Sequence, residues 1–452
     1  MFKLHSIPAG ARRLIYLLES NGYAAYIVGG CVRDTLIGRI PHDWDICTSA
    51  KPEEVCDLCE RHHIRTIKTG IQHGTVTAHY GVYDYEITTF RADGDYTDNR
   101  RPDSVEFVGD VIEDLGRRDF TINAMAYNDS YGLIDPWNGS YDLHIGLIHC
   151  VRNPDDRFRE DALRIMRALR FAATYNFRIE EKTAAAIHRN KHLLKNISAE
   201  RIRDELCKLL RGEGALDILL EYSDVMAVII PELEPCIGFN QNNKYHKYTV
   251  YDHIAHAVNF YKGSDISIKM ALLLHDIGKP ECYTEDHNGG HFYGHGRVSK
   301  KQAEKIMERL RFDNKTKEEV VTLVGYHDAD IYPGARTVKL WLNKIGPELL
   351  NKLIYVKLAD VMTHSEVNQE TMRDNVLGVR VIAKDILTKQ QCFTIKDLAI
   401  NGHDIIDLGL EPGPMVGRIL NYLLNKVMDG EIENELMALY EEGKRYLEDN
   451  HD

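Results

Sequence analysis

The hydrophobic periodicity of the chain changes near residue 153. Before it, short runs rich in β-branched and aromatic residues alternate with helix-like stretches, as in a domain that mixes strands and helices. These runs are YAAYIVGG, HDWDICT, GTVTAHY, YDYEITTF and GLIDPW. After it, apolar residues recur with helical spacing, beginning with DALRIMRALRFAATY. The chain is therefore predicted to be an α/β head followed by a mostly helical remainder.

The length of the chain and the positions of its glycines and prolines indicate further domain boundaries. With 452 residues, the chain is long enough for roughly three domains. The segment NGHDIIDLGLEPGPMVG precedes a last helical stretch and indicates a separate tail. We expect a head over residues 1–150, a neck over 151–212, a helical body over 213–390 and a tail over 391–452.

The composition is typical of a globular protein, with 44% apolar and 28% charged residues. No apolar run approaches the ~20 residues that span a bilayer, and the first 20 residues predict an amphipathic helix rather than a signal peptide. Nine cysteines, an odd number, predict reduced thiols and a cytoplasmic location. Cys56 and Cys59 precede His62 and His63 on a helix-like stretch. Because no second ligand pair follows at the usual spacing, we do not expect zinc there.

Charge is unevenly distributed along the chain, whose net charge is −13. The segment from Arg152 to Arg211 has 15 Lys and Arg against 9 Asp and Glu, whereas the segment from Gln391 to Asp452 has 5 against 13. A basic neck on an acidic protein can bind phosphates without binding polyanions indiscriminately. Charge alone also allows an ordinary solvated helical surface.

The most informative run is VGGCVRDTLIGRIPHDWDICTS. A strand that ends in Gly29-Gly30 leads into a helix, and such a turn lets backbone N–H groups and Arg33 approach a phosphate. Asp43 and Asp45 would point to one face of a strand. Two neighbouring carboxylates oppose joint ionisation unless a cation is present, and Mg²⁺ favours such ligands together with substrate phosphates. Either feature alone is usually structural, but together they indicate phosphate chemistry at a metal.

These residues carry a family resemblance. The pattern Gly29-Gly30-x-Val-Arg33-Asp followed by Asp43-x-Asp45 resembles the nucleotidyltransferase signature of the DNA polymerase β superfamily. Three further segments resemble successive motifs of class II, bacterial-type CCA-adding tRNA nucleotidyltransferases: RRDFTINA at 117–124, DPWNGSYDL at 135–143 and EDALR at 160–164. The resemblance covers about residues 20–210. It implies an α/β nucleotidyltransferase head with a mixed sheet, followed by an all-α neck, body and tail.

The resemblance implies roles for the matching residues of the head. Asp43 and Asp45 would bind Mg²⁺ for catalysis. Glu86, on a neighbouring strand, would complete the acidic set, although a cross-strand salt bridge is the alternative for this residue. The residues that would contact the triphosphate and ribose of the incoming nucleotide are Gly30, Arg33 and Arg118.

Without a nucleic-acid template, side chains must select the base. Asp161, Arg164 and Arg167 are three residues apart and would form one stripe on a helix. A carboxylate accepts from the exocyclic amino group that cytosine and adenine share, and an arginine donates to the adjacent ring nitrogen. Uracil and guanine would leave these groups unpaired.

The resemblance assigns this template role to Asp161 and Arg164, with Arg167 in support. It also places Arg170 in the nucleotide pocket, whereas helical geometry favours a brace or a phosphate contact for Arg170. A salt-bridged helix surface is the alternative for the whole stripe.

A second set of residues lies in the helical body, in the order H…HD…H…H…D, which resembles the HD phosphohydrolase superfamily. Its members are His253, His275, Asp276, His295, His327 and Asp360. The resemblance implies an HD domain at about 245–365, with a divalent metal held by His253, His275, Asp276 and Asp360. Such a metal activates water against a phosphoester, and related CCA enzymes use the domain as a phosphatase or 2′,3′-cyclic phosphodiesterase. Here the region precedes a further tail, so a purely structural metal is the alternative.

The function predicted from the sequence is Mg²⁺-dependent addition of CCA, from CTP and ATP, to the 3′ end of tRNA. The partner is tRNA, and neither a membrane nor a protein partner is expected. The polar segment between Ala92 and Pro102 resembles a loop that the family needs to switch from C to A addition, and the tail resembles a segment that contacts tRNA in bacterial CCA enzymes. The alternatives are a poly(A) polymerase or a CC- or A-adding enzyme, a metal phosphohydrolase with a vestigial head, and a non-catalytic RNA-binding protein.

Overall fold

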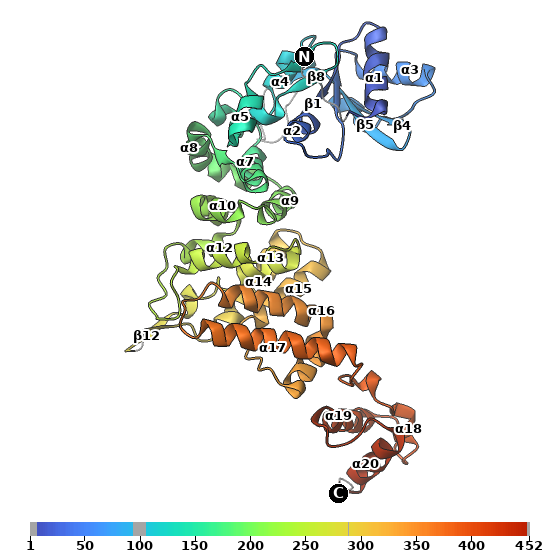
Figure 1. The fold of residues 1–452 in the computed structure, drawn as a ribbon, viewed down its shortest axis with the longest axis vertical. Coiled ribbons are helices and arrows are strands. Elements are labelled where there is room, and N and C mark those ends of the chain that lie inside the picture. The colour runs from blue at the N-terminus through green and yellow to red at the C-terminus, as the bar shows by residue number, and fades with distance from the viewer. Residues whose placement is uncertain (1–6, 94–104, 288, 450–452) are drawn as a thin grey trace. The chain divides into compact units, whose positions relative to one another are not determined.

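The structure, a computed structural model, describes residues 7–93, 105–287 and 289–449. The chain divides into two compact units (Figure 1). One consists of Met1–Glu234 with Arg309–Arg311, and the other of Pro235–Glu308 with Phe312–Asp452. The predicted domain boundaries at residues 150, 212 and 390 are not decided by this division and stay predictions.

The first unit begins with a mixed sheet of seven strands in the order β3-β4-β5-β2-β1-β8-β9. Neighbouring strands are antiparallel, apart from the parallel pair β2 and β5. The three strands β1, β2 and β8 are buried along their whole length and form the centre of the sheet. The bounds are β1 (Ala25–Val28), β2 (Ile46–Thr48), β3 (Arg65–Ile67), β4 (Thr75–Tyr80), β5 (Tyr83–Thr89), β8 (Ala126–Asn128) and β9 (Gly132–Ile134). This sheet confirms the predicted α/β head.

Five helices accompany the sheet, and a two-stranded ribbon lies between β5 and β8 in the chain. The N-terminal helix is amphipathic, as predicted, because it buries Leu14, Leu17 and Leu18. The bounds are α1 (Ala9–Ser20), α2 (Gly30–Leu36), α3 (Pro52–Arg61), α4 (Val111–Gly116) and α5 (Gly139–Ile145). The ribbon pairs β6 (Arg91–Asp93) with β7 (Val105–Phe107). The predicted switching segment between Ala92 and Pro102 lies, apart from Asp93, outside the described residues.

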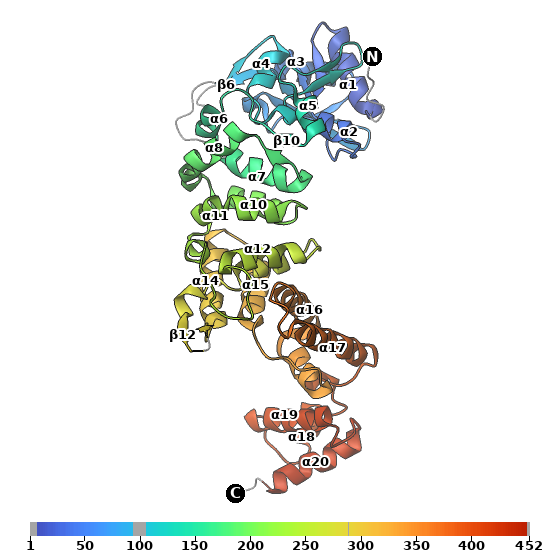
Figure 2. The ribbon, with the colours of Figure 1, turned by 60° about the vertical axis from the view of Figure 1, so that its left-hand side comes forward.

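Helices α6 to α11 complete the first unit (Figure 2). The first of them begins at Pro154 because the Asn153 side chain accepts a hydrogen bond from the Asp155 N–H group. The apolar face of α7 packs against α9 and α10. The bounds are α6 (Pro154–Glu160), α7 (Leu163–Tyr175), α8 (Glu181–Asn190), α9 (Ala199–Leu210), α10 (Ala215–Glu221) and α11 (Ser223–Ile229). A short parallel pair, β10 (Leu147–Ile148) and β11 (Arg178–Ile179), joins the end of the head to α7.

The second unit begins with six helices. Its central helix, α13, is buried on all sides except at its first residue, and it packs against α12, α15 and α16. α16 is interrupted at Gly346, whose φ of 80° is not helical, directly before Pro347. The bounds are α12 (Val250–Phe260), α13 (Ile266–Leu274), α14 (His295–Arg309), α15 (Asn314–Tyr326), α16 (Ala335–Val361) and α17 (Gln369–Thr388). A small ribbon pairs β12 (Thr284–Asp286) with β13 (Gly289–His291).

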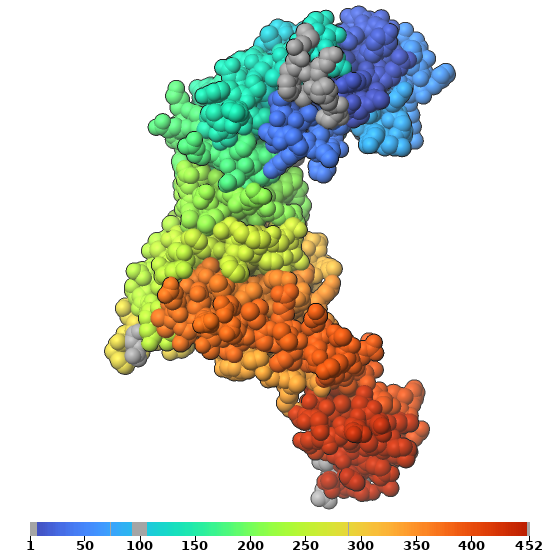
Figure 3. Space-filling model, viewed as in Figure 1, coloured from blue at the N-terminus to red at the C-terminus, as the bar shows by residue number. Residues whose placement is uncertain are grey.

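The C-terminal residues form a compact lobe with its own apolar core (Figure 3, red). The lobe consists of α18 (Gly402–Ile406), α19 (Pro414–Asp429) and α20 (Leu436–Asp449). Ile405, Leu423 and Leu439 are fully buried at its centre. In the described part of the chain, no helix is both long and apolar enough to cross a membrane.

Candidate functional site

The glycine turn between β1 and α2 lies against an arginine. Gly29 has a φ of 78°, a conformation that favours glycine, and its N–H group donates to the Met125 carbonyl oxygen at 3.1 Å. A Cβ atom at Gly29 would lie only 2.9 Å from Nη1 of Arg118. The turn therefore needs glycine both for its backbone conformation and for the close approach of Arg118.

Asp114 holds Arg118 in this position. The Asp114 carboxylate is fully buried and accepts hydrogen bonds from Arg117 Nε at 2.9 Å and from Arg118 Nη2 at 3.2 Å. Although burial raises the pKa of Asp114, the two guanidinium groups outweigh it and hold that pKa below its usual value. Nε of Arg118 has no hydrogen-bond partner among the described residues. The guanidinium group beside the glycine turn is thus only partly hydrogen-bonded.

Asp43 and Asp45 lie in the segment directly before β2, and not within the strand as predicted from the sequence. The β1–β2 pairing nevertheless continues to Asp45, because the Val28 N–H group donates to its carbonyl oxygen at 3.0 Å. Asp45 is half-buried and Asp43 is exposed. The predicted strand began at least three residues too early, since regular pairing ends where the chain enters from a loop.

Glu86 lies on β5, the parallel neighbour of β2. The register pairs Ile46 with Ile87, so the residues that precede them, Asp45 and Glu86, are neighbours across the two strands. Burial, then the charges of Asp43 and Glu86, raise the pKa of Asp45 to about 6. No ion pair of Glu86 is found within the described residues, so the salt bridge weighed as its alternative is not present there. The charges of Asp43 and Glu86 are therefore close enough to Asp45 to disfavour its ionisation.

Arg33 connects the turn to the helix that follows the head. Its guanidinium group lies 5.1 Å from the ring centre of Phe171 and 5.0 Å from that of Tyr175, both on α7. Its Nη1 atom donates to Oδ1 of Asn123. The Tyr175 hydroxyl group donates to the Asp34 carboxylate at 2.8 Å. The first turn of α2 is thereby held against one face of α7.

Asp161 does not belong to the helix that carries the arginines. It has extended dihedral angles (φ −133°, ψ 103°) and separates α6 from α7. Its side chain accepts from the Leu163 N–H group at 3.0 Å, and this bond starts α7. The prediction of one continuous stripe is therefore wrong for Asp161, because a capping aspartate stabilises a helix start better than a helix interior. Asp161 also binds Nη2 of Arg201 at 3.1 Å.

The three arginines of α7 are each held by a carboxylate. Arg164 donates to Glu160 and, at 3.1 Å, to the carbonyl oxygen of Arg117. Arg167 donates twice to one oxygen of Asp119, at 2.6 and 2.8 Å. Arg170 donates to Glu205 at 2.8 Å and lies over the ring of Phe171. These contacts fit the brace expected for Arg170.

Asp119 connects Asn123, near the glycine turn, to Arg167 on α7. Its Oδ1 atom accepts from Nδ2 of Asn123 at 2.9 Å, and its Oδ2 atom accepts from Arg167. Although burial raises the pKa of Asp119, Arg167 and Asn123 hold it below its usual value. A continuous set of hydrogen bonds therefore runs from Arg33 through Asn123 and Asp119 to Arg167. We did not single out Asp119, Phe171 or Tyr175 from the sequence, although the i, i+4 spacing of the two aromatic residues indicates a shared helix face.

The second cluster of titratable side chains lies within the second unit. His253 lies on α12, His275 and Asp276 follow α13, and Asp360 lies on α16. The potential ligand atoms of these four residues lie within 4.8 Å of one another. A second group with the same spacing joins Asp276 to His295 and His327. The carboxylates of the head are not among the groups with this spacing.

Hydrogen bonds to backbone carbonyl groups determine which nitrogen of these imidazoles carries the proton. Nδ1 of His275 lies 2.7 Å from the Leu272 oxygen, and Nδ1 of His327 lies 2.7 Å from the Val324 oxygen. Because a carbonyl oxygen only accepts, Nδ1 carries a proton, and in the neutral ring the lone pair of Nε2 points into the cluster. His295 makes the same bond to Phe292 at 2.9 Å.

The imidazole nitrogens face one another in two pairs. Nε2 of His295 lies 3.0 Å from Nε2 of His327, and Nε2 of His253 lies 3.2 Å from Nε2 of His275. Burial lowers the pKa of His253 to about 4, which keeps this ring neutral. Although burial lowers the pKa values of His275 and His295, the Asp276 carboxylate raises both above their usual value. Each pair of nitrogens needs a proton or a cation between them, because two lone pairs at such distances repel each other. The donor set therefore fits a bound metal.

Asp276 lies between the two imidazole pairs. Its Oδ2 atom lies 3.3 Å from Nε2 of both His253 and His275, whereas its Oδ1 atom lies 3.3 Å from His295 and 3.5 Å from His327. A carboxylate in this position can bridge two cations. Asp276 also lines a cavity of about 730 Å³ within the second unit.

Two further histidines, which the sequence analysis missed, belong to this region. His246 and His364 form a third group with His253, again with potential ligand atoms within 4.8 Å. His364 follows Asp360 by four residues, a spacing that places both on one side of a helix end. This spacing could have identified His364 from the sequence. Cys56 and Cys59 are buried on α3 and do not belong to any group of potential metal ligands in the described residues.

Known protein families match three parts of the chain. Residues 25–149 match the Poly A polymerase head domain, residues 176–237 the probable RNA and SrmB-binding site of polymerase A, and residues 292–442 the putative tRNA nucleotidyltransferase domain 2. The first match contains the glycine turn and the head carboxylates. The third contains the histidines from His295 onward.

Whole-length relatives agree with these matches. The chain is 36% identical to a CCA-adding enzyme of Lactobacillus delbrueckii subsp. bulgaricus over 94% of both chains, and 33% identical to one of Ligilactobacillus salivarius over 99% of both. A crystal structure of the Bacillus stearothermophilus CCA-adding enzyme in complex with CTP is 29% identical, with a TM-score of 0.72, over 100% of this chain and 99% of that chain. The chain belongs to the family of CCA-adding enzymes.

Proposed function

We propose that this protein adds CMP, CMP and AMP, from CTP and ATP, to the 3′ end of tRNA without a nucleic-acid template and releases pyrophosphate. The observation that carries this proposal is the group formed by Asp43, Asp45 and Glu86 beside the Gly29 turn and Arg118. The CTP complex of the similar Bacillus enzyme and the whole-length relatives support the choice of substrates.

The head residues suit transfer of a nucleotidyl group. Asp43, Asp45 and Glu86 would hold Mg²⁺, which when bound promotes ionisation of the attacking 3′-hydroxyl group and neutralises charge on the departing pyrophosphate. Arg118 and the glycine turn would hold the triphosphate of the incoming nucleotide. The tRNA 3′ oxygen then forms a bond to the α-phosphorus, the bond from the α-phosphorus to the pyrophosphate oxygen breaks, and the hydroxyl proton passes to solvent.

The neck residues suit selection of the base. Asp161 would accept from the exocyclic amino group of cytosine or adenine, and Arg164 would donate to the adjacent ring nitrogen. Glu160 and the carbonyl group of Arg117 orient the Arg164 guanidinium group. Because Arg167 is joined to Arg33 through Asp119 and Asn123, the position of the base-reading helix follows that of the phosphate-binding turn. Arg170 and Arg167 act as braces of this helix.

A second activity is supported by the histidine cluster. We propose that His253, His275, Asp276 and Asp360 hold one divalent metal, and that His295, His327 and Asp276 hold a second. When bound, such metals supply an activated water for attack on a phosphoester. The opposed lone pairs and the cavity beside Asp276 support this phosphohydrolase site. Its substrate would be a terminal or cyclic phosphate on an RNA end.

We also propose a cytoplasmic location. All nine cysteines are free thiols, and seven of them are buried. Thiols persist in this state in a reducing compartment.

Removal of a head carboxylate should abolish transfer. Asp45→Asn and Glu86→Gln should each lower incorporation of labelled CMP into tRNA that lacks its CCA end by on the order of 10²- to 10³-fold, because a lost metal ligand removes several kcal/mol of transition-state stabilisation. The matched control is Asp84→Asn, an exposed carboxylate two residues before Glu86 on β5. Equal activity of Glu86→Gln and Asp84→Asn would exclude a catalytic role for Glu86.

Binding of Mg²⁺ should depend on pH in a specific direction. The pKa of Asp45 is raised to about 6, so the group gains protons as the pH falls through this value, and a cation must displace them. Calorimetric titrations in buffers of different ionisation enthalpy should show proton release near pH 6 and weaker Mg²⁺ binding below it. An affinity that stays constant between about pH 5 and pH 8 would contradict the raised pKa. Without Mg²⁺, the free energy of unfolding should fall as the pH rises through about 6, because the fold disfavours the ionised form of Asp45.

Loss of the Asp161 carboxylate should relax base choice. In Asp161→Ala, the ratio of CTP to UTP incorporation should fall by about 10- to 100-fold, because one hydrogen bond to the exocyclic amino group is lost. The variant Asp161→Asn keeps an oxygen that can cap α7 and separates base selection from helix stability. Asp156→Ala, an exposed carboxylate on α6, is the control and should keep the wild-type ratio. Unchanged fidelity in a folded Asp161→Ala variant would refute the template role.

The phosphohydrolase site should fail independently of the head. His275→Ala should abolish hydrolysis of a 2′,3′-cyclic phosphate by the full chain in the presence of Mn²⁺ or Ni²⁺, while CMP incorporation persists. Conversely, Asp45→Asn should leave this hydrolysis unchanged. A wild-type protein that binds these metals without hydrolysing the cyclic phosphate or RNA-terminal phosphates would leave the cluster with a structural role only.

A further inference from the structure

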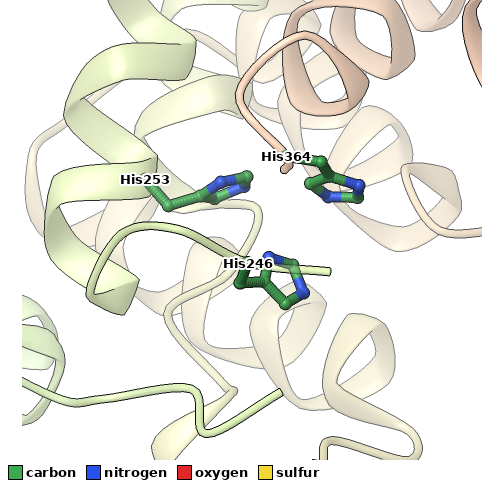
Figure 4. A group of neighbouring side chains, drawn as sticks. All are labelled: His246, His253 and His364. Atoms are coloured by element: carbon green, nitrogen blue, oxygen red, sulfur yellow. The ribbon is translucent and has the colours of Figure 1, made fainter. Parts of the chain in front are cut away.

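Three imidazole rings meet at one side of the histidine cluster (Figure 4). His253 comes from α12, His246 from the segment before that helix, and His364 from the segment after α16. The rings of His364 and His246 lie edge-to-face with their centres 4.7 Å apart. The rings of His246 and His253 lie edge-to-face with their centres 5.6 Å apart. The HD pattern described above accounts for His253 but not for the other two histidines.

The two segments that carry these additional histidines are joined by hydrogen bonds. The Ser365 N–H group donates to the Tyr245 carbonyl oxygen at 2.8 Å, and the Ser365 hydroxyl group donates to the Lys244 carbonyl oxygen at 2.7 Å. These bonds join the residues directly beside His246 and His364. The two rings are therefore brought together by backbone contacts and do not depend on any contact with each other.

The nitrogen atoms of this group are oriented as ligands. Nδ1 of His246 is buried and lacks a hydrogen-bond partner in the part of the chain that the structure describes. The hydroxyl group of Thr363 donates to the Asp360 carbonyl oxygen at 2.6 Å and so accepts from Nδ1 of His253 at 3.1 Å. Nε2 of His253 therefore has its lone pair directed into the cluster. A buried unpaired nitrogen destabilises the fold, and a bound cation would offset this cost.

Asp360 lies between His253 and His364. Its Oδ1 atom lies 3.0 Å from Nε2 of His253 on one side and 3.1 Å from Nε2 of His364 on the other. Asp276 contacts its two imidazole pairs through different oxygen atoms, whereas Asp360 contacts both histidines through the same oxygen atom. Each of the two carboxylates thus lies at a boundary between neighbouring ligand groups.

We propose that His246 and His364, with Asp360 as the shared carboxylate, form a third metal position beside the two of the phosphohydrolase site. The inference rests on that proposed site and extends it to a centre of three cations. Two imidazoles and one carboxylate favour a transition metal such as Zn²⁺, Co²⁺ or Fe²⁺ over Mg²⁺. Because His246, His364 and Asp360 line the same cavity as Asp276 and His295, a cation in this position would contact a phosphate bound there.

The test is the number of metal ions bound by the full chain. The parent protein carries Asp43→Asn and Asp45→Asn, so that the head does not contribute, and is stripped of metal and dialysed against Co²⁺. Metal analysis should find three equivalents in this parent and two in each of the variants His246→Ala and His364→Ala. The visible absorption of bound Co²⁺ should be weaker in both variants than in the parent, because the third ion no longer contributes to it. His403→Ala, which removes an exposed histidine of α18, should keep three equivalents.

The possible outcomes separate the two proposals. Two equivalents in the parent and in both variants would overturn the third position and leave the two-metal site intact. Fewer than two equivalents in the parent would overturn both. His246→Asn, which preserves polarity and approximate size, should also bind two equivalents. Thermal unfolding of each variant establishes that a lost equivalent reflects a lost ligand and not a lost fold.

Discussion

Both functional regions of this protein hold together groups that repel each other unless a cation or a proton lies between them. In the head, the half-buried Asp45 lies beside Asp43 and Glu86, and its pKa is raised. In the second unit, the Nε2 atoms of paired histidines face each other at 3.0 and 3.2 Å. The backbone imposes these positions, through the parallel pairing of β2 with β5 and through carbonyl groups at helix ends that fix each tautomer. A cation therefore offsets a free-energy cost that the fold itself creates.

The first unit couples recognition of the phosphates to recognition of the base. Arg33 lies against two aromatic rings of α7, and hydrogen bonds connect it through Asn123 and Asp119 to Arg167 on the same helix. In an enzyme without a template, the base must meet its readers at a constant distance from the reacting phosphorus. A buried network with charged members holds such a distance well, because any displacement leaves polar groups unpaired.

Much of this organisation was predictable, and the errors have specific causes. The runs rich in β-branched and aromatic residues predicted β1, β2, β4, β5 and β9, but β3 and β8 were missed. Asp161 was placed on a helix by its spacing from Arg164 and Arg167. Spacing does not reveal that an aspartate caps the next helix and breaks the one before it. His246 and His364 were missed because neither belongs to the pattern that defined the other ligands.

The family, the α/β head with its helical continuation, and the residue types able to bind phosphate and metal could be predicted from the sequence, because local periodicity and motif spacing are properties of neighbouring residues. Which of these groups contact one another depends on the folded chain. Glu86 lies beside Asp45, 41 positions before it, through a strand pairing, and Asp360 contacts His253, 107 positions before it. Such contacts depend on the packing of distant segments, and so do the raised pKa of Asp45 and the direction of each imidazole lone pair.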